Sequence, residues 1–410
     1  MTDGYHQNKT EEKNDVVPAP AQRRNPFCVL WRGILSFFPC RKDVAGEVVR
    51  KLVFLLCLCT LLVSAGYLLS NLYVQPQQNE QLQVELENLY RPENSMTVVS
   101  TEEDSFPKGM LASFKDLYRR NDEVRGWLQY HAAGKEDFFH IDYPVMHSGD
   151  NDKYLTVDFD ENKNKNGALF FDGSNRVSSR EDENRSLIIY GHNMASGQMF
   201  AGLNRLLGNL GNARAASMMT LSTLFRQDDY LVFAVILTDE EESNNAFYFN
   251  PRRTSFASDE DFLTYVGEMR ARSMFDYPVE VHADDQLLVL STCSNKNSSK
   301  LKDGRVVVVA RRRRGNEADV DTTKIVKNED VIMPRAWYVN QELPLHPFYG
   351  GDEESDVTVT TTLTTTTTTT VAVESSVADV SYDEFDASDV SDYIEISYVR
   401  PNDTSDDISN

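Results

Sequence analysis

Cysteine and basic charge are both scarce in this 410-residue chain. It has five cysteines, and its 41 lysines and arginines face 64 aspartates and glutamates, which gives a formal net charge of -23. An acidic excess of this size lacks the electrostatic footprint of a nucleic-acid-binding protein, so we expect no nucleic-acid partner. The length exceeds that of one typical domain, so we expect several segments with different roles.

The acidic excess is concentrated at the C-terminus. Residues 352–410 contain fifteen Asp or Glu and one Arg, so this segment contributes -14 of the net charge. It also contains the run TVTTTLTTTTTTTV at 358–371. Such a composition buries too little apolar surface to offset the entropy lost on ordering. We therefore predict a disordered Thr-rich acidic tail over 341–410, which is either a solvated extension or a wall-spanning or glycosylated spacer.

The chain has one long uncharged apolar run, Leu52–Leu69, LVFLLCLCTLLVSAGYLL. Its length suits a tilted helix across about 30 Å of hydrocarbon. The flanks differ in charge: the upstream basic residues are Arg23, Arg24, Arg32, Arg41, Lys42, Arg50 and Lys51, and the downstream acids are Glu80, Glu85, Glu87 and Glu93. The positive-inside rule then predicts a cytosolic basic arm over 1–51, a single-pass signal anchor in the cell membrane over 52–74, and an extracellular remainder.

This topology distributes the cysteines unevenly. Cys28 and Cys40 would be cytosolic, Cys57 and Cys59 would lie in the membrane span, and Cys293 would be the one exported thiol. A single exported thiol cannot form a disulfide within its own domain. Cys293 is therefore buried and inert, paired with another chain, or used chemically.

The stretch around this thiol predicts strand, loop and strand. The sequence LLVLSTCSNKNSSKLKDGRVVVVARRRR covers 287–314, and its second apolar run begins at Arg305 after the turn signal Asp303-Gly304. If the two strands pair antiparallel, Cys293 and Arg305 face each other at one rim, as a nucleophile and an anion stabiliser would. The plainer alternative is a small buried Cys and a solvated Arg. The run 311–314 has a similar pair of alternatives: a solvated strand end, or a basic patch that holds the acidic tail near the barrel.

A second strand end presents a histidine. The segment SLIIYGHNM, 186–194, is an apolar strand that stops at Gly191 and places His192 in the following loop. An unperturbed thiol is only a few per cent ionised at neutral pH, so cysteine chemistry needs a neighbouring cation or base. His192 and Arg305 are residues of the types that could assist Cys293, although a single histidine is more often structural.

The remaining pattern indicates a β-barrel or sandwich that begins near Phe106, after a polar stalk over 75–105. Apolar spacing between Met110 and Gln129 predicts one or two amphipathic helices. Ser258 to Met274 predicts a helix with Ser258 as its N-cap. The further predicted strands are 138–145, 168–171, 186–190, 230–237 and 246–250.

Several segments together resemble the class B sortases, the membrane-anchored cysteine transpeptidases of Gram-positive bacteria. The resemblance covers about residues 106–314. Its segments are DLYRRNDEVRGWLQY, IDYPVMHSGDNDKYLTVDF, GALFFDGSN, YGHNM, SFASDEDFLTYVGEMRARSMFD, LLVLSTCS and GRVVVVARR. The helix before the Cys strand favours class B over the other sortase classes. Departures are the long HAAGKEDFFH segment, the long N-terminal arm and the tail.

The resemblance implies a mainly β fold: an eight-stranded sortase barrel with N-terminal helices and an inserted helix, forming a catalytic domain over 106–340. It implies that Cys293 forms a thioacyl intermediate, that His192 acts as acid and then base, and that Arg305 steadies the oxyanion. Four further residues would line the peptide groove: Asn151, Leu155, Tyr190 and Ser291. The groove would also include positions near 250–257.

The partners implied are surface proteins with a C-terminal sorting signal, cleaved after Thr, and an amine acceptor on a peptidoglycan precursor or a pilin. No cofactor or metal is expected. Cell-wall attachment and pilus assembly fit the same residues, and the sequence does not separate them. A rival hypothesis is a non-catalytic sortase-like scaffold, although a scaffold would not need to keep Cys293, His192 and Arg305 together.

Overall fold

A computed structural model describes residues 37–40, 43–90, 97–98, 106–134, 139–244, 246–295, 300–315 and 317–349, and the backbone of 358–362 and 368–372. Most of the predicted cytosolic arm, including Cys28, and the acidic segment after residue 372 lie outside these residues. The chain divides into two compact units, Met1–Gln75 and Pro76–Asn410. Each is described by itself.

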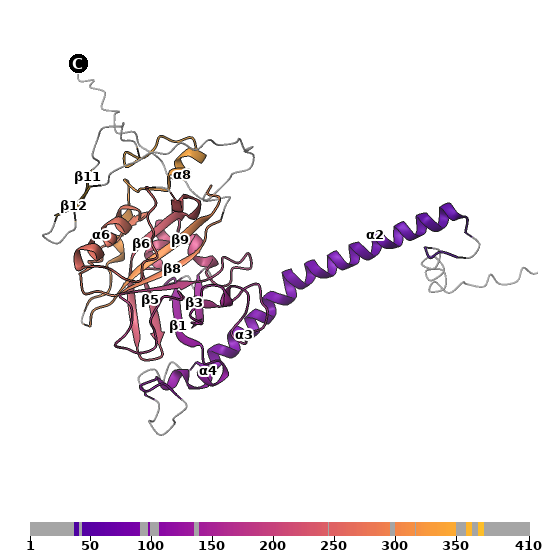
Figure 1. Cartoon of the computed structure of the whole chain (residues 1–410), viewed down its shortest axis with the longest axis horizontal. Coiled ribbons are helices and arrows are strands. Elements are labelled where there is room, and N and C mark those ends of the chain that lie inside the picture. Colours follow the sequence, from indigo (N-terminus) through magenta and orange to yellow (C-terminus); the bar gives the residue numbers. More distant parts are fainter. Residues whose placement is uncertain are drawn as a thin grey trace, which may run out of the picture. The chain divides into compact units, whose positions relative to one another are not determined.

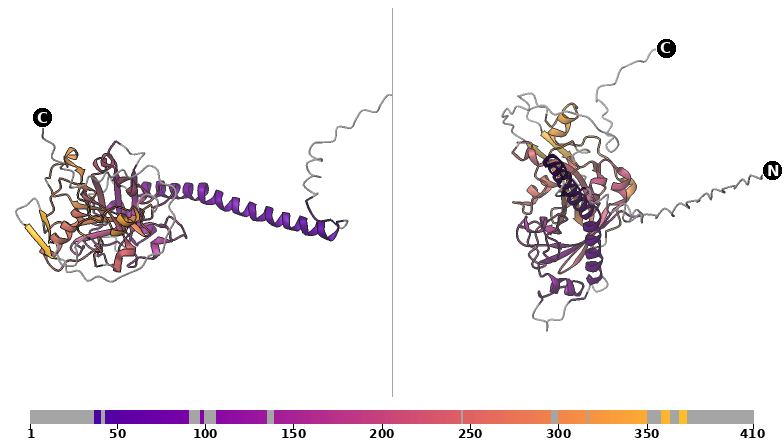
Figure 2. Two further views of the ribbon diagram at one scale, coloured as in Figure 1. Left: turned by 90° about the horizontal axis from the view of Figure 1, so that it is seen from above. Right: turned by 90° about the vertical axis from the view of Figure 1, so that its right-hand side faces the viewer.

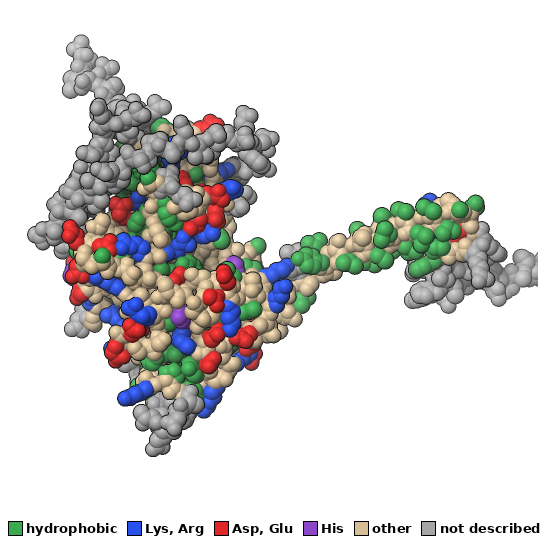
Figure 3. Space-filling model, viewed as in Figure 1, with side chains coloured by type: hydrophobic (Ala, Val, Ile, Leu, Met, Phe, Trp, Pro, Cys, Tyr) green, Lys and Arg blue, Asp and Glu red, His purple; other side chains and the backbone are tan. Residues whose placement is uncertain are grey.

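The first unit contains the apolar helix α2, Ala45–Leu69, and a π-helical turn η1, Ser70–Val74. The 25 residues of α2 rise about 37 Å at 1.5 Å per residue. None of its side chains is buried, and hydrophobic side chains cover its length (Figure 3). By length and composition α2 could therefore span a membrane, where the sequence predicted an apolar anchor.

The second unit is built on a closed barrel of eight strands in the order β1-β2-β3-β4-β8-β9-β6-β5. This confirms the predicted fold class. Figures 1 and 2 show this unit from three directions. The strands are β1 (Val124–His131), β2 (His140–Met146), β3 (Leu169–Phe171), β4 (Ser186–Tyr190), β5 (Met218–Thr223), β6 (Gln227–Asp239), β8 (Leu287–Cys293) and β9 (Gly304–Arg312). Pairs β2–β3 and β4–β8 are parallel and the others are antiparallel.

β-Branched and leucine residues fill the central strands because both faces of the sheet are covered there. The first six residues of β8 and the run Val306–Ala310 of β9 are all buried. Helix α6, Asp259–Ala271, packs beside β6 (Figure 1). It buries Phe262, Tyr265 and Val266. The Ser258 hydroxyl accepts a hydrogen bond from the Asp261 N–H at 3.1 Å, which confirms the predicted N-cap.

Helix α3, Gln75–Leu89, covers another part of the barrel wall, within the segment that the sequence predicted to be a stalk. Its Leu86 is buried, and Tyr90 beyond its end stacks on Trp127 of β1 with ring centroids 4.5 Å apart. The Tyr90 hydroxyl also donates to Ser222 at 2.8 Å. Burying side chains of this size stabilises the packing by about 1.5 to 3 kcal/mol each. The first part of the stalk segment is therefore helical and packed on the barrel.

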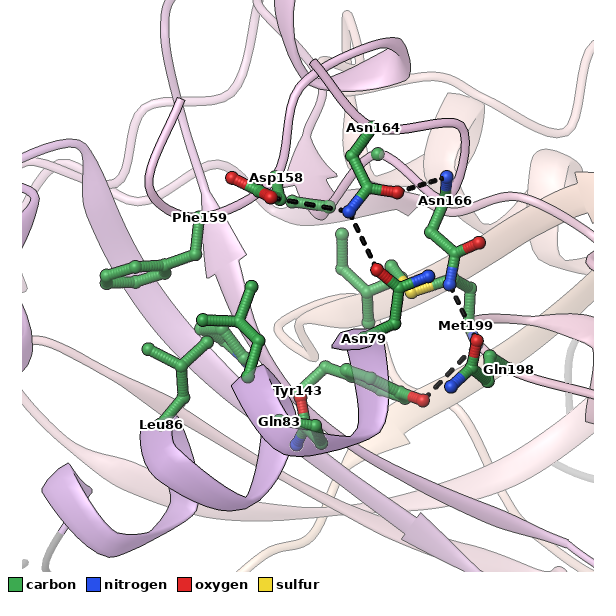
Figure 4. A pocket seen from close by; sticks show the side chains of 15 residues that line it. Asn79, Gln83, Leu86, Tyr143, Asp158, Phe159, Asn164, Asn166, Gln198 and Met199 are labelled. Atoms are coloured by element: carbon green, nitrogen blue, oxygen red, sulfur yellow. Dashed lines mark hydrogen bonds between the residues drawn. The ribbon is translucent and has the colours of Figure 1, made fainter. Parts of the chain in front are cut away.

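A cavity of about 40 Å³ lies between α3 and the barrel (Figure 4). Amide side chains border it: Asn164 donates to Asn79 at 2.7 Å, and Asn166 donates to Gln198 at 2.8 Å. This volume holds about one or two water molecules and no peptide. The cavity is therefore part of the packing of α3 on the barrel and not a peptide-binding site.

Shorter elements connect these parts. They are η3 (Ala112–Phe114), α4 (Lys115–Arg120), η4 (Lys153–Leu155), η5 (Ala201–Leu206), α5 (Leu210–Ala215), η6 (Glu240–Asn244), β7 (Phe275–Asp276), η7 (Thr322–Lys324), β10 (Val326–Lys327) and α8 (Arg335–Asn340).

Two predictions of local structure are wrong, and one strand was missed. Within the segment Met110–Gln129, which was predicted to be helical, the last helix ends at Arg120. The end of the segment belongs to strand β1, whose residues pair with β2 and β5. Residues 246–250 form no strand; their aromatic rings pack separately, and Phe247 contacts Phe348 and Tyr349. Strand β5 was not predicted. Tertiary pairing overrides a local period at these positions.

The C-terminal region also differs from its prediction. Residues 341–349 continue the packed domain, with Phe348 only 9% exposed. Two parts of the Thr-rich run form the paired antiparallel strands β11 (Thr358–Thr362) and β12 (Thr368–Ala372), in keeping with the β propensity of threonine. Arg311 is fully buried, so for this residue the first of the two alternatives, a solvated strand end, is wrong.

Candidate active site

Cys293 is the exposed last residue of β8, whereas the six residues before it are buried. It pairs with Arg305 in the antiparallel register of β8 and β9. This confirms the predicted juxtaposition, which depended on the turn at Asp303 and Gly304. The thiol is therefore accessible, and the alternative of a small buried cysteine is wrong for Cys293.

His192 leaves the barrel at the same end. In the parallel pair β4–β8, Tyr190 lies opposite Ser291, and His192 and Cys293 each follow two residues later. Two hydrogen bonds extend this register: the Gly191 N–H donates to the Ser291 carbonyl at 3.4 Å, and the Thr292 hydroxyl donates to the Gly191 carbonyl at 2.8 Å. The histidine loop is thus tied to the strand that carries the thiol.

Glycine is required between β4 and the histidine. A Cβ atom on Gly191 would lie 2.4 Å from Cδ2 of Leu169 and 2.8 Å from Cδ2 of Phe200. Both neighbours are buried side chains that cannot move away freely. Glycine in the Tyr-Gly-His pattern therefore allows the chain to pack closely against Leu169 and Phe200 as it leaves the sheet. The next residue, His192, then lies at the rim.

The imidazole of His192 is oriented by a backbone carbonyl. Its Nε2 lies 2.8 Å from the Leu155 carbonyl oxygen, at the end of η4. A carbonyl can only accept, so Nε2 carries the proton in this contact and Nδ1 is left as the basic nitrogen of the neutral ring. His192 can therefore exchange a proton through Nδ1 without losing its support.

Arg305 is held on one side and open on the other. Its Nη1 donates to the Asp303 carboxylate and lies 3.3 Å from the Gly304 carbonyl oxygen. Within the described residues, Nε and Nη2 have no hydrogen bond. The side chain is 23% exposed. Donors of Arg305 thus remain for an anion or a carbonyl, while Asp303 fixes the guanidinium.

An asparagine network supports the end of β8. Asn204 of η5 donates to the Cys293 carbonyl at 3.1 Å and accepts from the Asn295 N–H at 2.9 Å. Asn193, next to His192, donates to the Asn295 side chain at 2.7 Å. Sequence reasoning missed all three. Asn193 follows His192 and Asn295 lies two residues after Cys293, so both could have been found from their neighbours. Asn204 is 89 positions from Cys293, and no sequence pattern marks it.

Two of the predicted groove residues converge on Asp172, which the sequence did not single out. Tyr190 donates to its carboxylate at 2.9 Å, and Asn151 donates at 3.2 Å. Burial alone would raise the pKa of Asp172, but the hydrogen bonds from Ser174, Tyr190 and Asn151 lower it. Burial and the nearby carboxylate raise the pKa of Tyr190. Asp172 is therefore an ionised acceptor that orients both side chains.

The other two groove predictions meet a different geometry. Ser291 is only 3% exposed, so its side chain is buried beneath the rim. The described contact of Leu155 with the site is through its carbonyl, which faces His192. The predicted loop over 250–257 lies beside the Asp172 segment, where the Thr254 and Ser174 hydroxyls are 3.2 Å apart.

The rim brings an accessible thiol, an oriented imidazole and an open guanidinium to three neighbouring strand ends. These groups fit acyl transfer: a thiolate attacks a carbonyl, the imidazole moves a proton, and the guanidinium binds the resulting oxyanion. Among the described residues, a possible metal-ligand cluster occurs elsewhere, at His131, His140 and Asp142.

Comparisons with known proteins identify the family. The family model for the sortase domain matches residues 137–313. Sortase B of Listeria monocytogenes is 29% identical over 195 residues, which are 47% of this chain and 71% of the relative. Sortase B of Staphylococcus aureus is 24% identical over 254 residues, 62% and 93% of the two chains. The crystal structure of sortase B from Bacillus anthracis covers 60% of this chain and 100% of its own, with 26% identity and a TM-score of 0.47. The chain belongs to the sortase family and is a class B sortase, a cysteine transpeptidase.

Proposed function

We propose that this transpeptidase cleaves the C-terminal sorting signal of surface proteins after Thr and transfers the new carboxyl end to an amine of the cell wall or of a pilin. The observation that carries the proposal is the convergence of Cys293, His192 and Arg305 at one rim of the barrel. The segment after the membrane-spanning α2 would face the outside of the cell, where such substrates lie.

The first half-reaction forms a thioacyl enzyme. The Cys293 thiolate attacks the Thr carbonyl carbon, the C–N bond breaks, and the protonated His192 gives its Nδ1 proton to the leaving amine. The hydrogen bond from Nε2 to the Leu155 carbonyl keeps the ring in place through this change. The product is a thioester on Cys293 and a free C-terminal fragment of the signal.

Arg305 acts while the carbonyl carbon is tetrahedral. Its open Nε and Nη2 donors bind the oxyanion or a neighbouring substrate carbonyl, while Nη1 stays on Asp303. This division requires the planar guanidinium, which offers several donors at fixed angles. Asp303 is therefore a positioning residue for Arg305.

The second half-reaction releases the enzyme. An acceptor amine attacks the thioester, His192 takes the proton that the amine loses, and the Cys293 thiolate leaves. One imidazole thus serves as acid in one half and as base in the other. The pair Asn151 and Tyr190, fixed on Asp172, would contact the peptide at the groove, and Leu155 would border it.

The test uses the full-length chain in detergent, a panel of LPxTG-like and NPxTx-like peptides and an amine acceptor. Mass spectrometry should find a thioacyl adduct on Cys293, and Cys293→Ala should abolish adduct and product. Cys40→Ala, which removes another exposed thiol, is the matched control and should retain full activity. Product formation by the Cys293→Ala chain would overturn the assigned nucleophile. Absence of any adduct across the panel would overturn the proposed substrate class.

A further inference from the structure

Two histidines and an aspartate meet on strands β1 and β2. His131 and His140 are directly paired in the antiparallel register, and their rings are stacked with centroids 4.3 Å apart. His131 Nε2 lies 3.8 Å from Asp142 Oδ2. One ligand atom from each of the three side chains lies within 4.8 Å of the other two.

The pairing explains why these side chains share one face. Asp142 follows His140 by two residues and pairs with Gln129, which precedes His131 by two. Alternate residues of a strand point to the same side of a sheet, so all four lie on one face. The intervening Tyr130 and Ile141 are buried in the barrel core. The cluster is therefore on the outer wall.

The cluster is separate from the Cys293 site. Strand β2 pairs with β3 through Val145 and Met146, at the end of β2 opposite His140. From that end the pairing continues through Phe170 and Tyr190 to Ser291, at the rim that carries Cys293. Along β2, Asp142 lies three to four residues, or roughly 10 to 13 Å, from this connection, and His140 lies five to six residues from it.

The Asp142 carboxylate is already oriented. The Trp127 indole N–H donates to Oδ1, and the Gln129 amide donates to Oδ2 at 3.2 Å. Trp127 is only 1% exposed and is fixed by its stack on Tyr90. Each carboxylate oxygen has a second lone pair, so Oδ2 can bind a cation while it accepts from Gln129. Such neighbours orient the carboxylate ligands of metal sites.

We propose that His131, His140 and Asp142 form a zinc-binding site on the barrel wall. Ligands at about 2.0 to 2.1 Å from a tetrahedral Zn²⁺ stand about 3.4 Å apart. The His131–Asp142 separation of 3.8 Å is close to this value, and the exposed His140 can rotate to complete the set. Water would fill the fourth position.

The donor types favour zinc over the alkaline-earth ions. Imidazole nitrogen suits Zn²⁺ and its transition-metal neighbours, whereas Ca²⁺ and Mg²⁺ select sites made of oxygen ligands. A bound ion would join the two strands across the connection between His131 and His140. Because it binds the folded chain, it would also raise the stability of the β1–β2 pair with increasing zinc concentration.

The test is a zinc titration of the full-length chain in detergent with its thiols blocked by alkylation, because thiolates also bind zinc. Calorimetry should find one equivalent of zinc and no calcium binding. His140→Ala and Asp142→Asn should each weaken zinc binding by about 100-fold. Gln129→Ala, which removes only a neighbour of the carboxylate, should weaken it by about tenfold. A zinc-dependent rise in the unfolding temperature should be lost in the same variants.

The matched control is His282→Ala. Its imidazole Nε2 also lies near a carboxylate, 3.6 Å from Glu280, but within the described residues it belongs to no group of three ligands. It should bind zinc as the unmodified chain does. The proposal is overturned if zinc binds no more weakly to His140→Ala than to His282→Ala, or if the alkylated chain takes up no zinc. In either case, His131 and Asp142 form only a cross-strand side-chain contact.

Discussion

Strand β9 carries an arginine near each end, and the two differ in their surroundings. Arg305 pairs with Cys293 at the rim, is partly exposed and has one carboxylate partner, Asp303. Arg311 pairs with Leu287, is fully buried and has both terminal nitrogens on Glu317. Its remaining contacts are with the carbonyls of 280 and 312 and with the carboxylate of 285.

The comparison separates two uses of one side chain. A buried guanidinium must have all its donors satisfied, because an unpaired buried charge is costly. Arg311 approaches that need with four hydrogen bonds, and its full burial keeps it away from any ligand. Arg305 keeps donors open because water can satisfy them until a substrate arrives. The number of fixed partners, rather than the residue type, distinguishes a structural arginine from a candidate catalytic one.

The largest expected effect is on catalysis at Arg305. Arg305→Lys keeps the charge but loses the planar fork, so the rate of thioacyl formation should fall by about 10² to 10³. Single-turnover assays with a peptide substrate would measure this rate. Urea unfolding should show unchanged stability. A similar loss of rate in a conservative Arg311 variant would remove the distinction between the two arginines.

The next effect is on stability at Arg311. Arg311→Met fills a similar volume but leaves Glu317 without its partner, so the free energy of unfolding should fall by about 3 kcal/mol. Activity per folded molecule should stay unchanged. Arg313→Met is the matched control: Arg313 is 26% exposed at the same end of the barrel, and its loss should cost less than about 1 kcal/mol. Equal losses of unfolding free energy in Arg311→Met and Arg313→Met would mean that burial of the guanidinium does not determine its contribution to stability.

The sequence predicted the Cys293 end of this strand pair better than the Arg311 end. Asp303-Gly304 marks the turn side of β9, and the apolar run before Cys293 sets the length of β8, so their register could be inferred. The run of four arginines at 311–314 has no alternation that distinguishes a buried position. Its burial depends on Glu317 and Asp285, which only the folded chain brings together.

The same limit applies to the site. His192 was found because a strand, a glycine and a histidine occur in sequence. Asn204 and Asp172 were missed, since each acts through partners that lie far away in the chain. Ser291 was assigned to the groove by resemblance, but the packing of β8 buries it. Local patterns predict strand ends well, whereas partners across the barrel need the fold.

A smaller effect should appear in the pH dependence of the Arg311 end. The hydrogen bond from Arg311 lowers the pKa of Glu317 from 4.5 to about 2. The folded-state pKa is below the ordinary value, so this contribution is complete above about pH 4.5 and is lost as the pH falls toward 2. Its size should be about 1 to 2 kcal/mol, allowing for solvent screening.

Urea unfolding between pH 5 and pH 2.5 measures this contribution. Glu317→Gln should flatten the dependence relative to the unmodified chain. The control Asp319→Asn removes a carboxylate that is 85% exposed and should leave the curve unchanged. An unchanged curve for Glu317→Gln would show that this carboxylate does not titrate with folding.

The smallest effect is expected for a cut after Tyr349, compared with a cut a few residues earlier. The first cut to consider, after residue 345, would remove Phe348 and Tyr349, which pack on Phe247, and the hydrogen bond from Tyr349 to the Met333 carbonyl at 2.8 Å. That cut should lower the free energy of unfolding by about 2 to 3 kcal/mol. A cut after Tyr349 keeps these contacts and should change neither stability nor the rate of peptide cleavage. Urea unfolding and the peptide assay on both truncated chains measure the difference. The tail contributes no described side chain to the Cys293 rim. A large loss of rate in the chain cut after Tyr349 would therefore show that the Thr-rich tail takes part in substrate handling.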